Sequence, residues 1–350
     1  MKNKNILFVI IIILIVVTII FIVCCNIMLE KYSIEDIPVD IVYTWVESNE
    51  EFEKEKMYWL QKTNKEDIEN KENSGSIRFK DNKELMYSLR SIEKYFPYYN
   101  NIYIIVKDGQ FPKYLKKDHP RIKIVNHSEI IPKEYLPTFN SCAIECFTHH
   151  IPNLSEYYLY LNDDFMFLKN LKKSYFIKNK DSPYILYSNP NYDKNIVDRI
   201  KNINLNSYNF YEAWAYNSKI LDKLHKIEQN GRHDLSHIPR MFKKSFNTKI
   251  EDVLKKYYVE NETVDVYTRT QMSKFRKNYN LALNVLMYPY LYHYLFDCKF
   301  KKTNESYIIF DNNNSTELNT EFLCVNIVKD ENNFSKYMNE IYPEKSSFEI

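Results

Sequence analysis

Residues 157–164, with the sequence YYLYLNDD, decide how the chain is expected to fold. Five tyrosines and leucines in a row, followed by polar residues that favour turns, are typical of a β-strand and its end. Similar β-branched and aromatic runs predict three more strands, at Val39–Trp45, Asn101–Val106 and Ile122–Val125. An amide and two carboxylates therefore follow the last of four predicted strands.

Helices are expected between these strands. Hydrophobic residues recur with helical spacing over residues 85–96, and Asp81 with Glu84 has the pattern of a capping box at the start of that helix. A second helix is expected at Ser141–Ile151. Strands that alternate with helices predict an α/β domain with a mainly parallel sheet over residues 37–190.

The rest of the chain gives weaker signals. Residues 191–335 are expected to be a mostly helical C-terminal part that completes the active site, and residues 336–350 a polar tail. Four cysteines lie beyond the N-terminal segment, and we expect packed thiols or disulfide partners without choosing a pairing: Cys142, Cys146, Cys298 and Cys324.

The N-terminal segment predicts a membrane anchor within residues 1–31. Ile6–Cys25 has only Thr18 as a clearly polar residue, and 20 helical residues span a ~30 Å hydrocarbon layer. Lys2 and Lys4 precede this run, so the positive-inside rule keeps the N-terminus in the cytoplasm. The sequence thus predicts a single-pass type II membrane protein whose catalytic domain is luminal or extracytoplasmic.

Composition excludes several classes of function. The 350 residues carry a net charge of only +2, from 48 basic and 46 acidic side chains, which argues against a nucleic-acid partner. With 3 glycines the chain has neither a dinucleotide fingerprint nor a P-loop, and no organic cofactor is expected. Any phosphate site must then use side chains, helix N-termini or a metal ion.

The best candidate site follows the strand quoted first. Ligands of open α/β sheets bind beyond the carboxyl ends of the strands, where Asn162, Asp163 and Asp164 are expected. Their hard oxygen atoms suit Mg²⁺ or Mn²⁺ held together with substrate phosphates. A solvated turn or helix cap explains the same three residues equally well.

Two further groups of residues are weaker candidates. Arg78, Asp81, Asn82 and Arg90 cluster around the start of the first helix, where arginines could bind phosphate oxygens, although ordinary helix-cap roles are the favoured explanation. His237 could serve as a general base or a phosphate contact, but a lone histidine is more often structural.

Together these segments resemble the Stealth family of hexose-1-phosphoryl transferases, which includes bacterial capsule polymerases and the catalytic subunit of the lysosomal-enzyme N-acetylglucosamine-1-phosphotransferase. The resemblance covers about residues 37–330 and is strongest before residue 168. Its four blocks, in order, are Asp40–Val46; a long block from Arg78–Asn82 through Tyr87–Glu93, Asp108–Gln110, Val125–His127, Leu136–Ser141 and Ala143–Glu145 to Leu161–Asp164; a fainter one of His237–Pro239 and Phe275–Arg276; and Cys324–Asn326.

The resemblance implies a nucleotide-sugar-transferase-like fold and transfer of a sugar-1-phosphate from a nucleotide-diphosphate sugar to a glycan hydroxyl. N-acetylglucosamine-1-phosphate is one candidate group. The catalytic residues it implies are Asp40, Asp163, Asp164, His237 and Arg276. Asp163 and Asp164 would hold the metal, Arg276 the phosphate charge, and His237 or Asp40 the acceptor proton. The expected substrate-binding residues are Trp45, Arg78, Asp81, Asn82, Arg90 and Asn140.

Departures from the family pattern keep two alternatives open. Asn280 and Ile327 stand where the family commonly has Asp. One alternative is a metal-dependent glycosyltransferase that moves the sugar alone and releases a nucleoside diphosphate. The other is a catalytically silent glycan-binding membrane protein.

Overall fold

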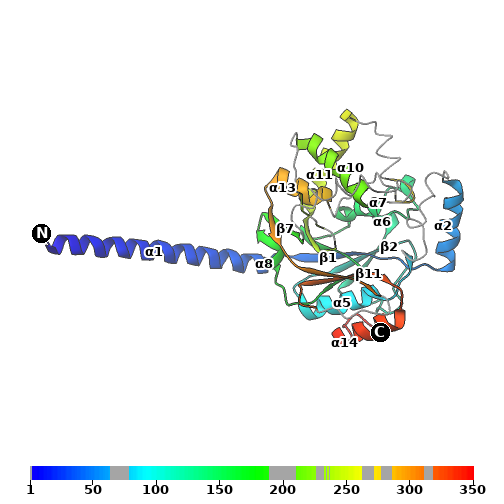
Figure 1. Cartoon of the computed structure of the whole chain (residues 1–350), viewed down its shortest axis with the longest axis horizontal. Coiled ribbons are helices and arrows are strands. Elements are labelled where there is room, and N and C mark those ends of the chain that lie inside the picture. Colours follow the sequence, from blue (N-terminus) through cyan, green and yellow to red (C-terminus); the bar gives the residue numbers. More distant parts are fainter. Residues whose placement is uncertain are drawn as a thin grey trace.

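The chain folds around a central sheet with a long helix that projects from it (Figure 1). This computed structural model describes residues 2–63, 79–188, 210–225, 232–233, 235, 237–261, 272–276, 286–310 and 318–350.

The central sheet confirms the predicted α/β fold. Its five strands lie in the order β3-β2-β1-β4-β8, and the first four are parallel while β8 runs antiparallel to β4. The four predicted strands are all present. The strand bounds are β1 Val39–Thr44, β2 Ile102–Val106, β3 Ile122–Asn126, β4 Tyr157–Asn162 and β8 Arg240–Lys243.

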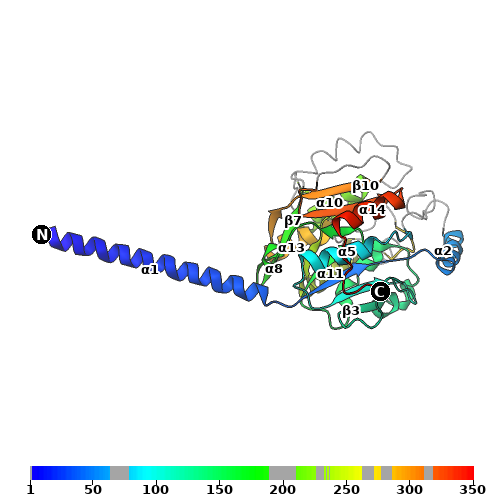
Figure 2. The ribbon, with the colours of Figure 1, turned by 90° about the horizontal axis from the view of Figure 1, so that it is seen from below.

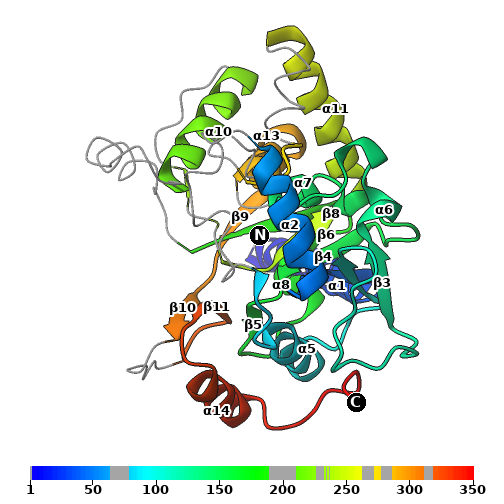
Figure 3. The ribbon, with the colours of Figure 1, turned by 90° about the vertical axis from the view of Figure 1, so that its right-hand side faces the viewer.

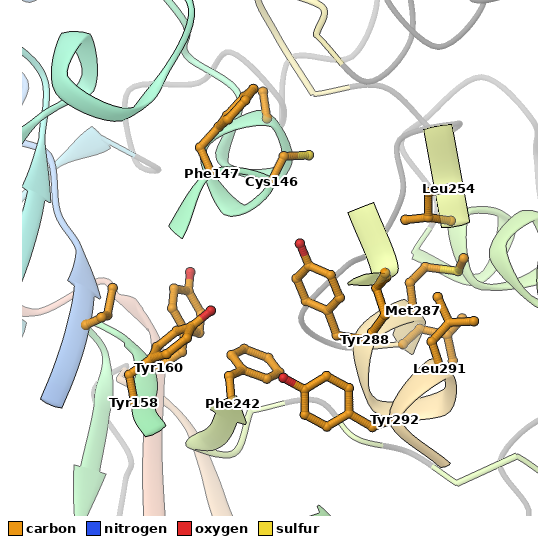
Figure 4. Close-up of a cluster of buried hydrophobic side chains, with 14 of the residues drawn as sticks. Cys146, Phe147, Tyr158, Tyr160, Phe242, Leu254, Met287, Tyr288, Leu291 and Tyr292 are labelled. Carbon is orange, nitrogen blue, oxygen red and sulfur yellow. The ribbon is translucent and has the colours of Figure 1, made fainter. Parts of the chain in front are cut away.

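Helices cover both faces of this sheet (Figure 3). One face packs on α5 (Glu84–Tyr95), and Ile41 and Leu159 belong to the core on that side. The other face packs on α11 (Lys244–Asn261) and α13 (Tyr288–Phe296), with α10 (Phe210–His225) beyond them. Figure 4 shows the second core, in which Tyr158 and Tyr160 of β4 approach side chains of α13.

Two expected helix details are wrong. α5 begins at Glu84 after Lys83, which has a φ of 70° and no side-chain cap, so Asp81 and Glu84 do not form the expected capping box. The second helix stops early, as α7 (Ser141–Glu145), because the Thr148 hydroxyl bonds the Glu145 carbonyl oxygen and a short 3-10 helix, η3 (Thr148–His150), follows. Asn140 caps α7 through the backbone N–H of Cys142.

The C-terminal part contains more strands than expected. β10 and β11 pair with β5, the strand just after β4, in a second sheet, and β9 joins β6 and β7 in a third. Residues 191–335 thus supply four strands besides their helices. The remaining bounds are β5 Phe165–Phe167, β6 Ile177–Asn179, β7 Ser182–Tyr187, β9 Lys299–Lys302, β10 Glu305–Phe310, β11 Phe322–Val328, α2 Glu50–Lys62, α6 His127–Ile130, η2 Lys133–Tyr135 and α8 Lys173–Phe176.

The last fifteen residues are not a polar tail. They continue α14 (Glu331–Ile341) and then pack against the body of the protein, where Tyr342 and Phe348 are buried. Glu349 is also buried and forms a two-pronged ion pair with Arg90 of α5. Burial of Glu349 could not be predicted from the sequence, because its partner Arg90 lies 259 residues away.

The N-terminal helix α1 (Lys2–Glu35) extends away from the body (Figure 2). Its segment Ile10–Met28 is long and apolar enough to cross a membrane and is not buried by the rest of the chain. That segment could be a membrane anchor or a signal sequence. Lys173 of α8 fixes the end of the helix, because its ammonium group donates to the carbonyl oxygens of Glu35 (2.8 Å) and Ile37 (2.6 Å).

All six cysteines are free thiols. The four beyond α1 are buried, so of the two expected alternatives the structure has packed thiols and not disulfides.

Candidate active site

The fold brings four carboxylates together at the carboxyl edge of the central sheet. Asn162, the last residue of β4, pairs with Thr44, the last residue of β1, and the turn with Asp163 and Asp164 follows at once. A helix that connects parallel strands runs back across the sheet, so α5 starts at the same edge as β1 ends. Asp81 and Glu84 lie at this start.

The pKa is raised for every member of this carboxylate cluster, which consists of Asp81, Glu84, Asp163 and Asp164, and repulsion by another member contributes for all except Asp81, where the contributing charge is Glu47. Burial is the largest cause in each case. For Asp163 the neighbouring charges of Asp164, Glu84 and Asp81 add to it, and its pKa lies well above the usual range. The pKa of Asp164 rises to about 7, with Glu84 as the largest charged contributor. Such repulsion is what a bound cation relieves.

Within the cluster, Asp164 has a side-chain oxygen that accepts no hydrogen bond from the described residues. Its Oδ2 accepts a hydrogen bond from the Cys324 thiol of β11 at 3.6 Å, and its backbone carbonyl accepts from Val325 N–H at 3.0 Å. Among the described residues, nothing bonds the buried Oδ1. A buried carboxylate oxygen without a partner is costly, so it marks a position where a ligand belongs.

His237 reaches the cluster through the same thiol. Its Nδ1 lies 3.5 Å from Cys324 Sγ, and its ring packs on Tyr307 of β10 at 4.6 Å between centroids. The backbone of His237 has a φ of 56°, which side-chain-bearing residues seldom adopt. Strain of this kind is retained where the surroundings fix the residue, as at binding sites. The structure therefore connects His237 to Asp164 with one intervening side chain.

The chemistry of the cluster fits a hard divalent cation. All the donors are carboxylate oxygens, the type of ligand that Mg²⁺ and Mn²⁺ prefer. The unpartnered Oδ1 of Asp164 could serve as one ligand of such a cation, and Asp163 could supply a second. Asp81 and Glu84 already accept local backbone hydrogen bonds, from Lys83 N–H (2.8 Å) and Asn82 N–H (2.7 Å), so they complete the negative charge around the site.

Asp40 lies at the opposite end of the sheet, which contradicts its expected place in the active site. It pairs in register with Tyr158, four residues before Asn162, or roughly 13 Å along the strands. Its side chain is fully buried and accepts from Asn101 N–H (3.0 Å) and Ser155 N–H (2.7 Å). Asp40 thus joins chain segments at the amino edge of the sheet.

The structure also contradicts the expectation that Arg90 binds phosphate. Its five N–H groups face Glu349, Asn339, the Tyr342 carbonyl oxygen and the Met86 sulfur, and the side chain is buried. A guanidinium with all its donors engaged cannot bind a phosphate without breaking this arrangement. Arg78 and Asn280 lie outside the described residues.

Arg276 and Asn140 form a second group, beside α7. Arg276 donates through Nη2 to the Ser141 hydroxyl. Asn140 is fully buried, and its amide donates to the Ser273 carbonyl oxygen at 3.1 Å. Stacking of Phe139 on Phe275, with centroids 5.2 Å apart, holds the two segments together. The structure places Arg276 at the N-terminus of α7.

Trp45 and Asn82 border the carboxylate cluster. The Trp45 indole lies close enough to Asp81 to favour the charged form of that carboxyl, although burial dominates and raises its pKa. The Asn82 amide donates to Glu84 Oε1 at 2.7 Å. On the outer side of the loop after Trp45, a hollow of about 430 Å³ is lined by residues that follow β1 and β2, among them Glu47, Gln110 and Lys116.

The sequence did not identify three residues that the structure places in this site. Glu84 was assigned to a helix cap, Cys324 to a faint motif, and Tyr114 to nothing. Burial and the charges of Asp81 and Asp163 raise the pKa of Tyr114, which places its phenol beside the cluster. A carboxylate at the first position of a helix that follows a parallel strand is a usable signal, because that position faces the carboxyl edge.

One family model matches the region of the carboxylate cluster. The model of Stealth protein CR2, conserved region 2, matches residues 78–185, a range that contains α5, β2–β6, the turn of Asp163 and Asp164 and the first four residues of β7.

Similar curated proteins are polysaccharide phosphotransferases. A capsular polysaccharide phosphotransferase of Haemophilus influenzae is 35% identical over 255 residues, which cover 73% of this chain and 65% of that protein. One of Neisseria meningitidis is 40% identical over 39% of this chain and 37% of its own length, and one of Streptococcus thermophilus is 41% identical over 41% and 58%. The matched region thus spans about a third to two thirds of these relatives.

Among solved structures, the galactosyltransferase LgtC in complex with donor and acceptor sugar analogues matches with a TM-score of 0.41 and 10% identity. The match covers 88% of this chain and 96% of that one.

Proposed function

We propose, from the premise that this chain belongs to the Stealth family, that it transfers a sugar-1-phosphate from a nucleotide-diphosphate sugar to a hydroxyl of a glycan. The observation that carries the proposal is the cluster of four carboxylates at the carboxyl edge of the sheet, in which the buried Oδ1 of Asp164 has no hydrogen-bond partner among the described residues. A diphosphate with a divalent cation is the type of ligand that such a cluster needs.

The proposed reaction exchanges one phosphorus–oxygen bond for another. The acceptor hydroxyl oxygen attacks the phosphorus next to the sugar, the phosphoanhydride bond breaks, and a nucleoside monophosphate leaves. The anomeric carbon–oxygen bond stays intact. The proton of the acceptor hydroxyl passes to a base, for which we choose His237, because Asp40 lies at the far edge of the sheet.

The residues of the chain then have distinct tasks. Asp163 and Asp164 would hold Mg²⁺ or Mn²⁺, which supplies positive charge against the diphosphate. Arg276, at the start of α7, would bind a phosphate oxygen of the donor, where a guanidinium matches phosphate geometry. Cys324 fixes the carboxylate and the histidine relative to each other, since its sulfur lies 3.6 Å from Asp164 Oδ2 and 3.5 Å from His237 Nδ1.

We also propose that α1 anchors the enzyme as a single-pass type II membrane protein, with the catalytic domain luminal or extracytoplasmic. The support is the exposed apolar segment Ile10–Met28, which is joined to the body by the Lys173 contacts near Glu35. Anchoring would keep the catalytic domain close to glycans that are assembled or presented at the membrane.

The test is to identify the released nucleotide. The full chain in detergent is incubated with UDP-N-acetylglucosamine, a mannose-terminated glycan and Mg²⁺ or Mn²⁺, and the nucleotides are separated by mass spectrometry. Asp164→Asn serves as the control, because it changes one oxygen for nitrogen without changing the side chain's size. We expect UMP from the wild type and none from the variant.

Other outcomes separate the alternatives. UDP that depends on Asp164 would mean transfer of the sugar alone, by a glycosyltransferase. Binding of the nucleotide sugar without release of either nucleotide, across a panel of donors and acceptors, would mean a silent glycan-binding protein and would overturn the proposal.

A further inference from the structure

A second group of possible metal ligands lies away from the carboxylate cluster. His149 and His150 of η3 both direct Nε2 at one oxygen of Glu251 in α11, with distances of 2.8 and 2.9 Å to Oε2. The three candidate ligand atoms lie within 4.8 Å of one another. The group is a His–His–Glu site in which two neighbouring residues of the chain meet a third that is about 100 residues away.

The two imidazoles converge although they are adjacent in sequence. Their ring centroids are 4.4 Å apart and tilted by 56°, so both edges face the same point. His149 is 2% exposed at its side chain and His150 42%, so one side of the group is sealed by the protein and the other is open to solvent. This is the layout of a site with protein ligands on one side and a water molecule on the other.

The distances already approach those of a metal complex. Zinc binds nitrogen and oxygen at ~2.0–2.2 Å, so neighbouring ligand atoms in a tetrahedral site are roughly 3.3 Å apart. The two nitrogen–oxygen distances at Glu251 need to lengthen by only about half an ångström to reach this separation. Side-chain rotations of a few degrees supply a shift of that size.

The ligands must lose protons when a metal ion binds. Burial lowers the pKa of His149, against the opposing effect of Glu251. Without a metal ion, the Nε2 atoms of both histidines donate to the Glu251 carboxylate, and a metal ion would displace these protons. Burial acts to raise the pKa of Glu251, but hydrogen bonds from His149, His150 and Lys255 hold it far below its usual range. Lys244 and Lys255 are the cationic groups that face the site; Lys255 Nζ lies 2.6 Å from Glu251 Oε1.

We propose that His149 Nε2, His150 Nε2 and the Glu251 carboxylate form a binding site for a divalent transition-metal ion of the zinc class. Two imidazole nitrogens and one carboxylate oxygen are the ligands of zinc rather than of magnesium, which prefers oxygen alone. The fourth position is open to water on the exposed side of His150.

The location of this site indicates that a bound metal ion would stabilise the fold. Thr148, next to His149, bonds Tyr158 near the start of β4, and Asn247 of α11 bonds the same phenol at 2.6 Å. The carboxylate cluster follows the other end of β4, whose last residue Asn162 lies four residues after Tyr158, or roughly 13 Å along the strand. A metal ion here would therefore not touch the reacting phosphates. It would tie η3 to α11 and close a loop of about 100 residues, which restricts the unfolded chain.

The experiment measures thermal unfolding of the full chain in detergent after removal of metals by a chelator. Excess Mg²⁺ is present throughout, so that the carboxylate cluster is occupied and only the second site responds to Zn²⁺. At 100 times its dissociation constant, Zn²⁺ is expected to raise Tm by about 5 °C. Isothermal titration is expected to give one Zn²⁺ per chain.

Matched variants assign the site. His150→Ala removes an exposed ligand and should fold, and it is expected to abolish the Zn²⁺-dependent rise in Tm; Glu251→Gln is expected to do the same while it keeps a hydrogen-bond acceptor. His119→Ala, at a histidine outside the group, and Asp164→Asn should both keep the full rise. Lys255→Met, which removes the competing ammonium group, should bind Zn²⁺ several-fold more tightly.

Two results would overturn the proposal. One is a wild-type Tm that Zn²⁺ does not raise. The other is an equal rise in wild type, His150→Ala and Glu251→Gln, which would place the bound ion elsewhere on the protein.

Discussion

Asp40 and Asp164 are two carboxylates at opposite ends of the central strands, and their hydrogen bonding differs. Asp40 accepts from the backbone N–H groups of Asn101 and Ser155, so both of its oxygens are satisfied. Asp164 has one oxygen on a thiol and another that no described residue bonds. A satisfied buried carboxylate stabilises the fold, whereas an unsatisfied one among like charges needs a ligand. The two side chains also differ in exposure, since Asp40 is fully buried and Asp164 is partly exposed.

The largest expected effect follows from removing the charge of Asp164. Asp164→Asn is expected to lower turnover by about 10³-fold, because several kcal/mol of transition-state stabilisation come from a cation that this carboxylate would hold. Thermal stability should stay the same or rise, since one of four repelling carboxylates is gone. The checks are the rate of UMP release at saturating Mg²⁺ and Tm. A loss of turnover below tenfold would remove Asp164 from the metal site.

The matching change at Asp40 is expected to affect stability instead. In Asp40→Asn, one oxygen still accepts from Asn101, but the new NH₂ group meets the N–H of Ser155, where the carboxylate oxygen had been at 2.7 Å. The free energy of unfolding should fall by roughly 2–3 kcal/mol. Urea unfolding measures this loss, and UMP release per folded molecule should stay within about threefold of wild type. A stable but inactive variant would return Asp40 to the active site.

The features that could be predicted from the sequence are those that depend on residues close together in the chain. Alternating strands and helices gave the parallel sheet, and the position of Asp163 and Asp164 after a hydrophobic strand gave the carboxyl edge as the candidate site. Both inferences rest on patterns within about ten residues, which local conformational preferences control.

The sequence could not predict pairings across the chain. Arg90 meets Glu349 over 259 residues, and this contact converts an expected phosphate ligand and an expected polar tail into one buried ion pair. Cys324 meets Asp164 over 160 residues. Such partners are set by the packing of the whole fold, and no periodicity in either segment reports them. Asp40 was included on family resemblance alone, although its place near the start of the predicted strand Val39–Trp45 already put it away from the carboxyl edge.

The raised pKa of Asp164 predicts a pH dependence of stability. The native state holds its proton up to about pH 7, whereas an unfolded Asp releases it near pH 4, so the native state binds more protons between these values. Stability of the metal-free protein should therefore fall as pH rises from 5 to 8, with Tm lower by a few degrees.

Saturating Mg²⁺ should reverse that loss at pH 8, because the cation binds the charged form. Asp164→Asn should show a flatter profile and no response to Mg²⁺. Thermal unfolding at several pH values, with and without Mg²⁺, makes the comparison. Stability that rises from pH 5 to 8 in the metal-free wild type would contradict the assignment of a raised pKa to the cluster.

The smallest expected effect is at Cys324, which touches both Asp164 and His237 without a proposed chemical step of its own. Burial, followed by the charge of Asp164, raises the pKa of this thiol well above its usual value, so it stays protonated and donates to the carboxylate. That donation favours the charged form of Asp164, against burial and Glu84, which raise its pKa. Cys324→Ala should lower turnover about three- to tenfold, equivalent to ~1 kcal/mol.

Cys298→Ala is the matched control, because Cys298 is an equally buried thiol on the other side of the central sheet. Both variants lose the packing of one sulfur and should lose similar stability. Only Cys324→Ala should move the acid limb of the pH–rate profile to higher pH and raise the Mg²⁺ concentration needed at pH 7, since Asp164 has lost a donor that holds its pKa down. A profile that shifts equally in both variants would reduce Cys324 to a packing residue and leave His237 without its connection to the metal-binding carboxylate.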